Sequence, residues 1–445
     1  MNAQEKFENY FNSIDGRNLK ENIRKGTFTL NESMESMAEI SENIREYDLQ
    51  KFLRPLYGKN GINTNGIAEH PDFKDIAKTG ESIYQYIAPV FIDIRGSTRL
   101  SLNYDLETIK HFKDQVISTC IEVIRSFDGS VHRIMGDAVL GFFGSKSIEK
   151  HQAIIDLINC VIILRWFLEK IIQPLILIKF PDFEPRDFAF RIGCNFGDDE
   201  EVYWSNYGFM NVGEVSPTGL PIDLAAKLQS LADKNEIMLG QGLIDYVKWP
   251  KEYSKYKTNA EGENIYYVEP NYSYRDPKKG QLNYKMRLLD FKKTFRIIPF
   301  DTKSKSKIVP ELIPNNDIRY YCEVKKGDNW QSYISGSEYL DKGLELKFYI
   351  RVDNHSNIEF PLNILFTKKN NGEDVPFEQR NEHIQARILN KTINNGFGGA
   401  KNFTRFSTTI LPEKTAFTGL HTMLATVTDK NKKIIFRDEI GVLIK

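Results

Sequence analysis

Two short segments in the first half of the chain each place one aspartate beside apolar residues. Residues 91–98 read Phe-Ile-Asp-Ile-Arg-Gly-Ser-Thr, and residues 135–143 read Met-Gly-Asp-Ala-Val-Leu-Gly-Phe-Phe. The first segment predicts a buried strand that ends near Asp93, then a turn whose hydroxyl residues can cap a helix. The second predicts a hairpin with Asp137 at its tip.

If the two strands are neighbours, the two carboxylates converge on one point. Converging carboxylates bind divalent cations, and the free N–H groups of a helix N-terminus bind phosphate. Together these features predict a metal-dependent site for a nucleoside triphosphate. Either segment alone is better explained by an ordinary turn or cap residue. The pair, with a helix-length segment between its members, favours the site.

Four motifs give the segment 86–267 a resemblance to the catalytic domain of class III nucleotidyl cyclases, the adenylate and guanylate cyclases. The two aspartate segments match the two metal motifs of that family. Residues 191–197 (Arg-Ile-Gly-Cys-Asn-Phe-Gly) resemble the family's Arg-Ile-Gly strand. Residues 219–228 correspond in sequence to the family's asparagine-containing helix. The resemblance implies a ferredoxin-like sheet covered by helices, and a head-to-tail homodimer whose sites are shared between subunits.

The resemblance also implies roles for individual residues. Two divalent cations, Mn²⁺ or Mg²⁺, would be held by Asp93, Asp137 and the backbone carbonyl of Ile94. The residues expected to act in catalysis are Asp93, Asp137, Asp223 and Lys227. The residues expected to bind the nucleotide are Phe91, Ile94, Gly96, Ser97, Thr98, Arg133 and Leu220.

Four of these positions depart from the purine cyclases of the family. A lysine that reads the base is replaced by Arg133, and a polar residue near the asparagine-containing helix is replaced by Leu220. Leu220 offers no hydrogen bond to a purine, whereas Arg133 offers donors that suit the carbonyl oxygens of a pyrimidine. The transition-state asparagine and arginine are replaced by Asp223 and Lys227. Lysine keeps the positive charge of arginine but cannot donate two parallel hydrogen bonds as a guanidinium does. Asp223 adds a negative charge near the expected triphosphate.

These departures resemble the pyrimidine cyclases of Pycsar antiphage systems. That resemblance implies that UTP or CTP is converted to a cyclic nucleotide, which acts as a messenger on a separate effector protein. We expect a slight preference for UTP, because O4 of uracil accepts a hydrogen bond from Arg133 and the cytosine amino group does not. The alternatives are an adenylate cyclase, or an inactive domain that binds a nucleotide and signals without catalysis.

The composition describes a soluble globular protein. The 445 residues are 41% hydrophobic and 27% charged, with 60 basic and 60 acidic side chains. This balance predicts neither a nucleic-acid partner nor a membrane surface. The four cysteines are isolated, which fits a reducing cytoplasm. Charged residues interrupt the apolar stretch 153–180, which therefore predicts a buried helix and a short strand, not a membrane span.

The patterns predict an α+β protein with four parts. Residues 1–84 are expected to form a helical extension, 85–270 the ferredoxin-like catalytic domain, 271–300 a linker and 301–445 a β-rich domain. In the last part, apolar and polar residues alternate over 344–352, and turn-rich gaps separate short strands, which predicts an antiparallel β-sandwich. Its position resembles the C-terminal sensor domain attached to some bacterial nucleotidyl cyclases.

Overall fold

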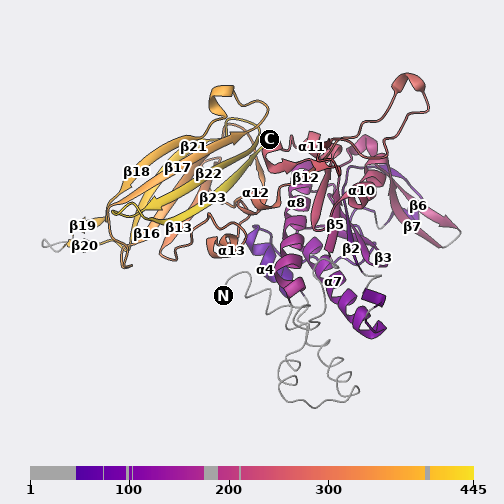
Figure 1. The fold of residues 1–445 in the computed structure, drawn as a ribbon, viewed down its shortest axis with the longest axis horizontal. Coiled ribbons are helices and arrows are strands. Elements are labelled where there is room, and N and C mark those ends of the chain that lie inside the picture. Colours follow the sequence, from indigo (N-terminus) through magenta and orange to yellow (C-terminus); the bar gives the residue numbers. More distant parts are fainter. Residues whose placement is uncertain are drawn as a thin grey trace, which may run out of the picture. The chain divides into compact units, whose positions relative to one another are not determined.

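A computed structural model describes the chain from residue 47 to residue 445. The residues outside its description within that range are 74, 97–99, 103, 175–188, 210–211 and 396–400. The described part of the chain divides into two compact units, of which the first lies within residues 47–244 and 256–289 and the second within residues 245–255 and 290–445 (Figure 1). Both units contain sheets, and the first also contains long helices, which confirms the predicted α+β class.

One sheet organises the first unit. The strands that this unit contributes run in the order β3-β4-β2-β5-β8-β12, and neighbours are antiparallel except for the parallel pair β5–β8. The strands are β2 (Ala88–Arg95), β3 (Ser130–Met135), β4 (Ala138–Phe143), β5 (Ala189–Cys194), β8 (Glu236–Gly240) and β12 (Met286–Leu289). Val90, Ile92 and Ile94 of β2 are at most 1% exposed, so this strand lies in the core.

A smaller sheet and several helices complete the first unit. The sheet has the order β1-β6-β7, and β10 pairs with β11. These strands are β1 (Ile83–Tyr84), β6 (Tyr203–Phe209), β7 (Val212–Thr218), β10 (Lys257–Thr258) and β11 (Asn264–Ile265). The helices are α4 (Asp48–Leu56), α5 (Ile76–Thr79), α7 (Leu106–Ser126), α8 (Lys150–Phe167), α10 (Leu220–Leu231) and α11 (Gln241–Tyr246), which extends into the second unit.

Helix α8 accounts for the first part of the long apolar stretch. Most of its residues are buried, and the chain continues as a π-helix over Leu168–Ile172. The prediction of a buried helix is therefore confirmed, while the strand expected after it lies outside the described residues. In the described part of the chain, no helix combines the length and apolar character that crossing a membrane requires.

Helix α10 lies directly on strand β5. A Cβ atom at Gly193 would lie 2.3 Å from the carbonyl oxygen of Ala225 and 2.3 Å from the amide nitrogen of Gln229. Such contacts are too short for any side chain larger than hydrogen, so glycine allows the helix to approach the strand this closely. The Gly193 of the Arg-Ile-Gly motif therefore has a packing function.

Helix α4 is joined to the end of α7 by buried charged groups. Arg54 donates hydrogen bonds to the carbonyl oxygen of Arg125 (3.2 Å) and to the carboxylate of Asp128 (2.6 Å). Lys59 bridges Asp128 and Asp156, at 2.9 Å from each carboxylate. Burial raises the pKa of Asp156 to about 6. The helical extension predicted over residues 1–84 lies mostly outside the described residues, and α4 belongs to its described part.

The second unit contains two sheets that share one hydrophobic core. Their strand orders are β14-β13-β16-β21 and β15-β23-β22-β17-β18. The strands are β13 (Ile318–Lys326), β14 (Asn329–Tyr333), β15 (Tyr339–Leu340), β16 (Glu345–Asp353), β17 (Leu362–Asn371), β18 (His383–Leu389), β21 (Phe406–Lys414), β22 (Gly419–Thr428) and β23 (Ile434–Ile444). Phe348 and Ile350 of one sheet and Ile364 and Phe366 of the other belong to the same buried cluster.

The remaining elements of the second unit are short. They are β9 (Ser254–Lys255), α12 (Phe291–Phe295), α13 (Thr302–Ser306), the paired strands β19 (Ile393–Asn395) and β20 (Lys401–Phe403), and 3-10 helices over Lys251–Tyr253 and Phe377–Gln379. Asp290 begins α12, and its side chain accepts a hydrogen bond from the amide of Lys293, which is ordinary N-terminal capping.

Candidate active site

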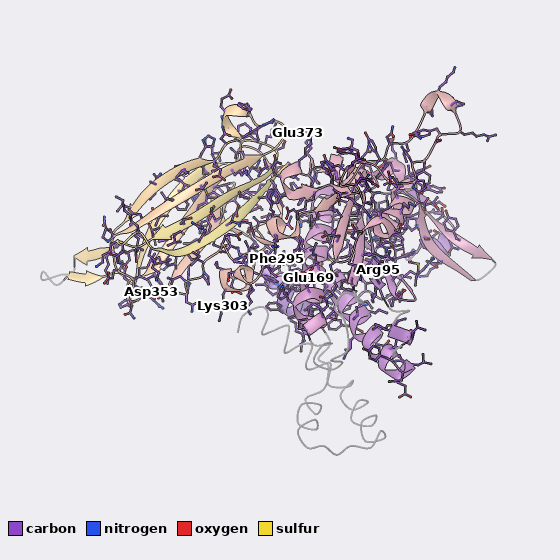
Figure 2. The ribbon with its side chains drawn as sticks, in the orientation of Figure 1. Arg95, Glu169, Phe295, Lys303, Asp353 and Glu373 are labelled. Atoms are coloured by element: carbon purple, nitrogen blue, oxygen red, sulfur yellow. The ribbon has the colours of Figure 1, made fainter. Side chains whose placement is uncertain are left out.

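The two aspartates of the sequence motifs belong to neighbouring segments of the central sheet. Asp93, near the end of β2, is paired with Ala138 of β4 across the antiparallel ladder. The amide of Ile94 donates a hydrogen bond of 3.2 Å to the carbonyl oxygen of Asp137. Asp137 lies in the turn between β3 and β4, where Gly136 has a φ of +66°, a value that favours glycine. Arg95, labelled in Figure 2, ends β2 at this edge.

The carboxylate of Asp93 is bound by two side chains from other elements. Its Oδ2 atom accepts hydrogen bonds from Nε of Arg191 at 3.0 Å, from Nη2 of the same guanidinium, and from Nε2 of Gln229 at 3.1 Å. Arg191 is the residue paired with Asp93 on β5, and Gln229 lies on α10. The side chain of Asp93 is 17% exposed, so solvent and ligands can still reach it.

Arg191 and Gln229 are site residues to which the sequence analysis gave no role. Arg191 is the first residue of a recognised motif. The residue that it contacts depends on which strand lies beside β2, and the sequence alone does not identify that strand. Gln229 reaches Asp93 because α10 packs closely on β5. The signal that could have identified Arg191 is a charged residue inside a strand whose other residues are buried.

The donor atoms at this edge of the sheet suit a hard divalent cation. The candidates are the carboxylates of Asp93 and Asp137 and the backbone carbonyl of Ile94, all of which supply oxygen. Among the described residues no group of three His, Cys, Asp or Glu side chains could enclose a metal ion. A cation here would therefore complete its shell with water or with the oxygens of a bound phosphate. The guanidinium of Arg191 already shows that positive charge is favourable beside Asp93.

The structure does not bring every predicted nucleotide-binding residue close to Asp93 and Asp137. Ser97 and Thr98 lie outside the described residues, while Gly96 follows β2 with a φ of +101°. Phe91 is half-buried and packs against a hydrophobic cluster that contains Leu140 and Trp204. Its side chain therefore contributes to the core.

Arg133 forms an ion pair that the sequence did not predict. Its guanidinium donates to Oε1 of Glu214 on β7, and Nε2 of His132 lies 3.0 Å from the same oxygen. Burial lowers the pKa of His132, so this imidazole is neutral at neutral pH. The Arg133 side chain is 44% exposed, which leaves the Arg133–Glu214 pair accessible to a ligand.

The other predicted residues lie on α10. Leu220 begins the helix and is 49% exposed, while Asp223 is exposed and Lys227 half-buried. Asp223 and Lys227 are four positions apart and therefore share a face of the helix. The helix that carries them also brings Gln229 to Asp93.

Comparison with known proteins identifies both parts of the chain. Residues 299–445 match the adenylyl/guanylyl and SMODS C-terminal sensor domain. A cytidylate cyclase from Escherichia coli is 35% identical over 93% of this chain and 91% of its own length. A cytidylate cyclase from Staphylococcus aureus is 34% identical over 88% of this chain and 86% of its own length. A second cytidylate cyclase from Escherichia coli is 31% identical over 90% of this chain and 84% of its own length.

Two solved structures resemble the chain more weakly than these relatives do. The adenylyl cyclase CyaB from P. aeruginosa has a TM-score of 0.37 and 17% identity, and the match covers 47% of this chain and 95% of CyaB. The guanylyl cyclase Cya2 has a TM-score of 0.34 and 18% identity, over 47% of this chain and 93% of Cya2.

The identity to curated relatives over most of both chains establishes the class of protein. The chain belongs to the class III nucleotidyl cyclases that carry a C-terminal sensor domain. It is a nucleotidyl cyclase, as the sequence motifs predicted.

Proposed function

We propose that this chain is a cytidylate cyclase that converts CTP to 3′,5′-cyclic CMP and pyrophosphate. The observation that carries the proposal is the 35% identity, over 93% of the chain, to a protein named cytidylate cyclase. In this reaction the ribose 3′-oxygen loses its proton and bonds to the α-phosphorus. The bond between that phosphorus and the oxygen leading to the β-phosphate breaks, and pyrophosphate leaves.

In the proposed site, Asp93, Asp137 and the carbonyl of Ile94 hold two divalent cations, Mn²⁺ or Mg²⁺. When bound, such ions lower the pKa of the ribose hydroxyl and neutralise charge on the phosphates. Arg191 holds the Asp93 carboxylate in position while no cation is bound. If a cation occupied Asp93, the planar guanidinium of Arg191 would be available to donate two parallel hydrogen bonds to phosphate oxygens.

The Arg133–Glu214 pair supports CTP over UTP. An arginine donates to the O2 and N3 acceptors of cytosine, and a carboxylate accepts from the 4-amino group. Uracil presents an oxygen at position 4, which a carboxylate repels. The sequence analysis preferred UTP because it considered Arg133 without Glu214. The contact between the two side chains, together with the names of the relatives, changes that preference.

The remaining roles follow from the family. Lys227 would supply positive charge at the transition state, and the exposed Asp223 would orient it from the same helix face. The enzyme would work as a homodimer with two sites, each using residues from both subunits. Its cyclic CMP would be the messenger of an antiphage system in the cytoplasm and would act on a separate effector protein.

The test is product identification from the purified chain with CTP, UTP, ATP and GTP in equal amounts, with Mn²⁺ or Mg²⁺. Mass spectrometry should find cyclic CMP and an equal amount of pyrophosphate. Cyclic UMP as the main product would reject the base assignment, and cyclic AMP would support the adenylate cyclase alternative. Binding of CTP without pyrophosphate release would indicate an inactive domain, provided that the activating signal is present.

A further inference from the structure

Strand β3 contains a β-bulge at His132. Val131 pairs with Gly141 and Arg133 pairs with Leu140, so His132 is the extra residue in the ladder between β3 and β4. Successive side chains of a regular strand point to opposite faces of the sheet, and a bulge changes the direction of the side chains that follow it. Val131 therefore shares one face with Gly141, and Arg133 shares the opposite face with Leu140.

The bulge brings His132 and Arg133 to the same face of the sheet. The ring of His132 lies 5.0 Å from the ring of Phe142. Phe142 and Leu140 belong to a buried cluster that also contains Trp204 of β6. This face of β3 and β4 is therefore the one that packs against the small β1-β6-β7 sheet. Two consecutive side chains of β3 can consequently contact one residue of that sheet.

Both side chains contact the carboxylate of Glu214 on β7. Nε2 of His132 lies 3.0 Å from Oε1 of Glu214, and the guanidinium of Arg133 donates to the same oxygen. Nε2 of His132 also lies 3.4 Å from Oγ of Ser216, which is two residues further along β7. Within the described residues, the contacts of this carboxylate go to Oε1, so Oε2 remains able to accept a hydrogen bond from a ligand.

His132 is buried, whereas its two charged neighbours are accessible. The side chain of His132 is 4% exposed, and those of Glu214 and Arg133 are 39% and 44% exposed. Burial of an imidazole is unfavourable unless its polar atoms are paired. The contact with Glu214 therefore fixes the histidine behind two groups that a ligand can reach.

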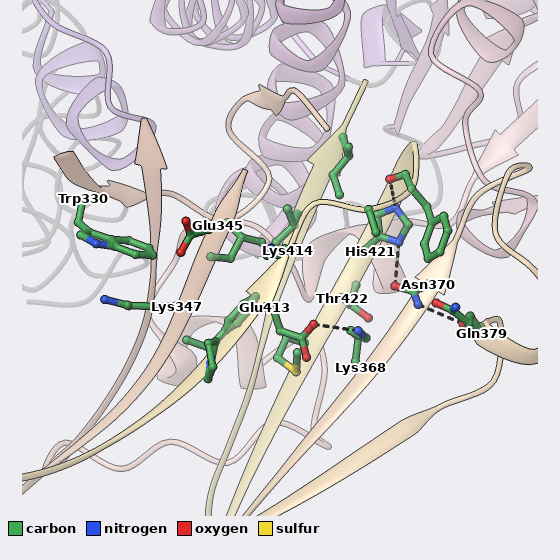
Figure 3. A pocket seen from close by; sticks show the side chains of 18 residues that line it. Trp330, Glu345, Lys347, Lys368, Asn370, Gln379, Glu413, Lys414, His421 and Thr422 are labelled. Atoms are coloured by element: carbon green, nitrogen blue, oxygen red, sulfur yellow. Dashed lines mark hydrogen bonds and ion pairs between the residues drawn. The ribbon is translucent and has the colours of Figure 1, made fainter. Parts of the chain in front are cut away.

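The other two buried histidines in the described part of the chain have partners of a different kind. Nε2 of His70 lies 2.9 Å from the carbonyl oxygen of Gly144. A ring nitrogen of His421 lies 3.1 Å from Oδ1 of Asn370 (Figure 3). These partners are neutral and buried, as is usual for a histidine that only stabilises the fold. The accessible carboxylate beside His132 favours a role connected with the site.

The environment of His132 determines which ring nitrogen carries the proton. Burial lowers the pKa of His132, the Glu214 carboxylate raises it, and the Arg133 guanidinium lowers it, with a net decrease. The imidazole is therefore neutral at neutral pH and has a single N–H group. Because a carboxylate only accepts hydrogen bonds, the proton is assigned to Nε2, which donates it to Glu214.

We propose that His132 is a positioning residue for recognition of the base. The hydrogen bond from its Nε2 fixes Oε1 of Glu214, so that Oε2 accepts from the 4-amino group of cytosine while Arg133 donates to O2 and N3. The proposal rests on the proposed function, in which Arg133 and Glu214 select CTP. His132 is buried behind Glu214 and acts only through it.

The test compares two substitutions of His132. His132→Phe removes the donated hydrogen bond and keeps an aromatic ring beside Phe142. It should raise KM for CTP about fivefold, leave kcat nearly unchanged and affect KM for UTP less. His132→Gln keeps an N–H donor and should lose less of the discrimination between CTP and UTP. The measurement is pyrophosphate release at varied concentrations of each substrate in the full chain.

Two further variants separate positioning from an effect on stability. His70→Phe makes the same change at a histidine of the same unit that is also 5% exposed, and it should leave the ratio of kcat/KM for CTP and UTP unchanged. In a Glu214→Ala background, His132→Phe should have no additional effect on this ratio, because His132 acts through Glu214. Thermal melting verifies that each variant is folded, and His132→Ala completes the cycle if His132→Phe does not fold.

Three outcomes would overturn the proposal. The first is an equal change in kcat/KM for CTP and UTP in His132→Phe, and the second is an equal loss of discrimination in His132→Phe and His132→Gln. The third is an additional loss of discrimination when His132→Phe is combined with Glu214→Ala.

A measurement without substrate distinguishes this proposal from the proposed function. A wild-type chain that makes no cyclic CMP contradicts the proposed function. In that case, NMR spectra of the full chain with ¹⁵N-labelled histidine still test the contact. A proton on Nε2 of His132, with a signal that changes in Glu214→Ala, supports the positioning of Glu214. A proton on Nδ1 instead, or a signal insensitive to Glu214→Ala, overturns it.

Discussion

Arg191 and Asp93 are paired across the β2–β5 ladder and joined by a hydrogen bond of 3.0 Å from Nε to Oδ2. The second guanidinium nitrogen binds the same oxygen. The protein itself therefore places a positive charge beside this carboxylate. A cation at Asp93, as proposed above, would compete with this ion pair.

The competition at Asp93 predicts that Arg191→Gln increases the affinity for Mn²⁺ in the absence of nucleotide. The expected increase is roughly tenfold, because a partly buried charge-assisted bond of about 1–2 kcal/mol no longer opposes the cation. Cyclase activity should fall, because the phosphates lose a bidentate partner. Electron paramagnetic resonance of free Mn²⁺ measures the binding. Unchanged or weaker Mn²⁺ binding would contradict the competition.

Removal of one carboxylate should abolish the reaction without unfolding the chain. Asp137→Asn is expected to lower the rate of cyclic CMP formation by roughly a hundredfold or more, because one ligand of the proposed cations loses its charge. Pyrophosphate release measures the rate, and the melting temperature reports on the fold. Glu200→Gln, at an exposed acidic residue of the same unit, is the matched control and should keep full activity. A variant with normal activity and metal dependence would reject the assignment of Asp137.

Loss of the Arg133–Glu214 pair should alter the choice of base. Glu214→Ala is expected to raise KM for CTP about tenfold and to reduce the discrimination against UTP, because the acceptor for the 4-amino group is lost. The measurement is kcat/KM for CTP and for UTP, with thermal melting as a control for folding. An equal effect on both substrates would assign Glu214 a purely structural role.

Gly193→Ala should destabilise the first unit. The added methyl group would meet backbone atoms of α10 at 2.3 Å, which cannot move without shifting the helix. Overpacking of this kind costs about 1–3 kcal/mol, measured as a lower denaturant midpoint. The control is Gly66→Ala, where the new methyl group meets the flexible side chain of Glu69. Equal stability of the two variants would contradict the close packing of α10.

The stability of the first unit should fall in acid because of His70. Its ring donates to the carbonyl oxygen of Gly144 at 2.9 Å and accepts from the amide of Asp72 at 3.2 Å, an arrangement that suits the neutral imidazole. Burial lowers the pKa of His70 to about 4. The unfolded chain has the ordinary value near 6.5, so the native state binds this proton less readily.

The direction in which stability changes with pH follows from that difference in pKa. The stabilisation is complete above about pH 6.5 and is lost as the pH falls to about 4, by an amount on the order of 3 kcal/mol. Chemical denaturation at several pH values measures this loss. The difference between the wild type and His70→Gln isolates His70, because the other buried histidines titrate in both proteins. Parallel pH profiles of the two proteins would refute the prediction.

Local features of the fold were predictable, whereas contacts between distant segments were not. The β3–β4 hairpin with Asp137 at its turn was predicted correctly, because Gly-Asp between two apolar runs is a short-range signal. The exact bounds of α7 (Leu106–Ser126) were less predictable, because turn and cap preferences locate helix ends only approximately. The alternation over residues 344–352 corresponds to β16, whose neighbours depend on long-range pairing.

The same distinction applies to the site. Asp93 and Asp137 could be named from their motifs, and the class of enzyme followed from four motifs in order. The partners Arg191, Gln229 and Glu214 could not be assigned, because each contact joins residues about 80 or more positions apart in the sequence. The predicted domain boundaries and the roles of Asp223 and Lys227 remain predictions.

The buried contacts of Arg54 with the end of α7 restrict how this protein can be recombined with its relatives. Arg54 and Asp128 come from segments that a chimera would normally take from different parents. A hybrid that has only one of them would lose this ion pair, while Arg54 would keep its hydrogen bond to the carbonyl oxygen of Gly61 and Asp128 its pairing with Lys59. Crossover points for domain exchange are therefore better placed beyond residue 156, where both partners of Lys59 are retained together.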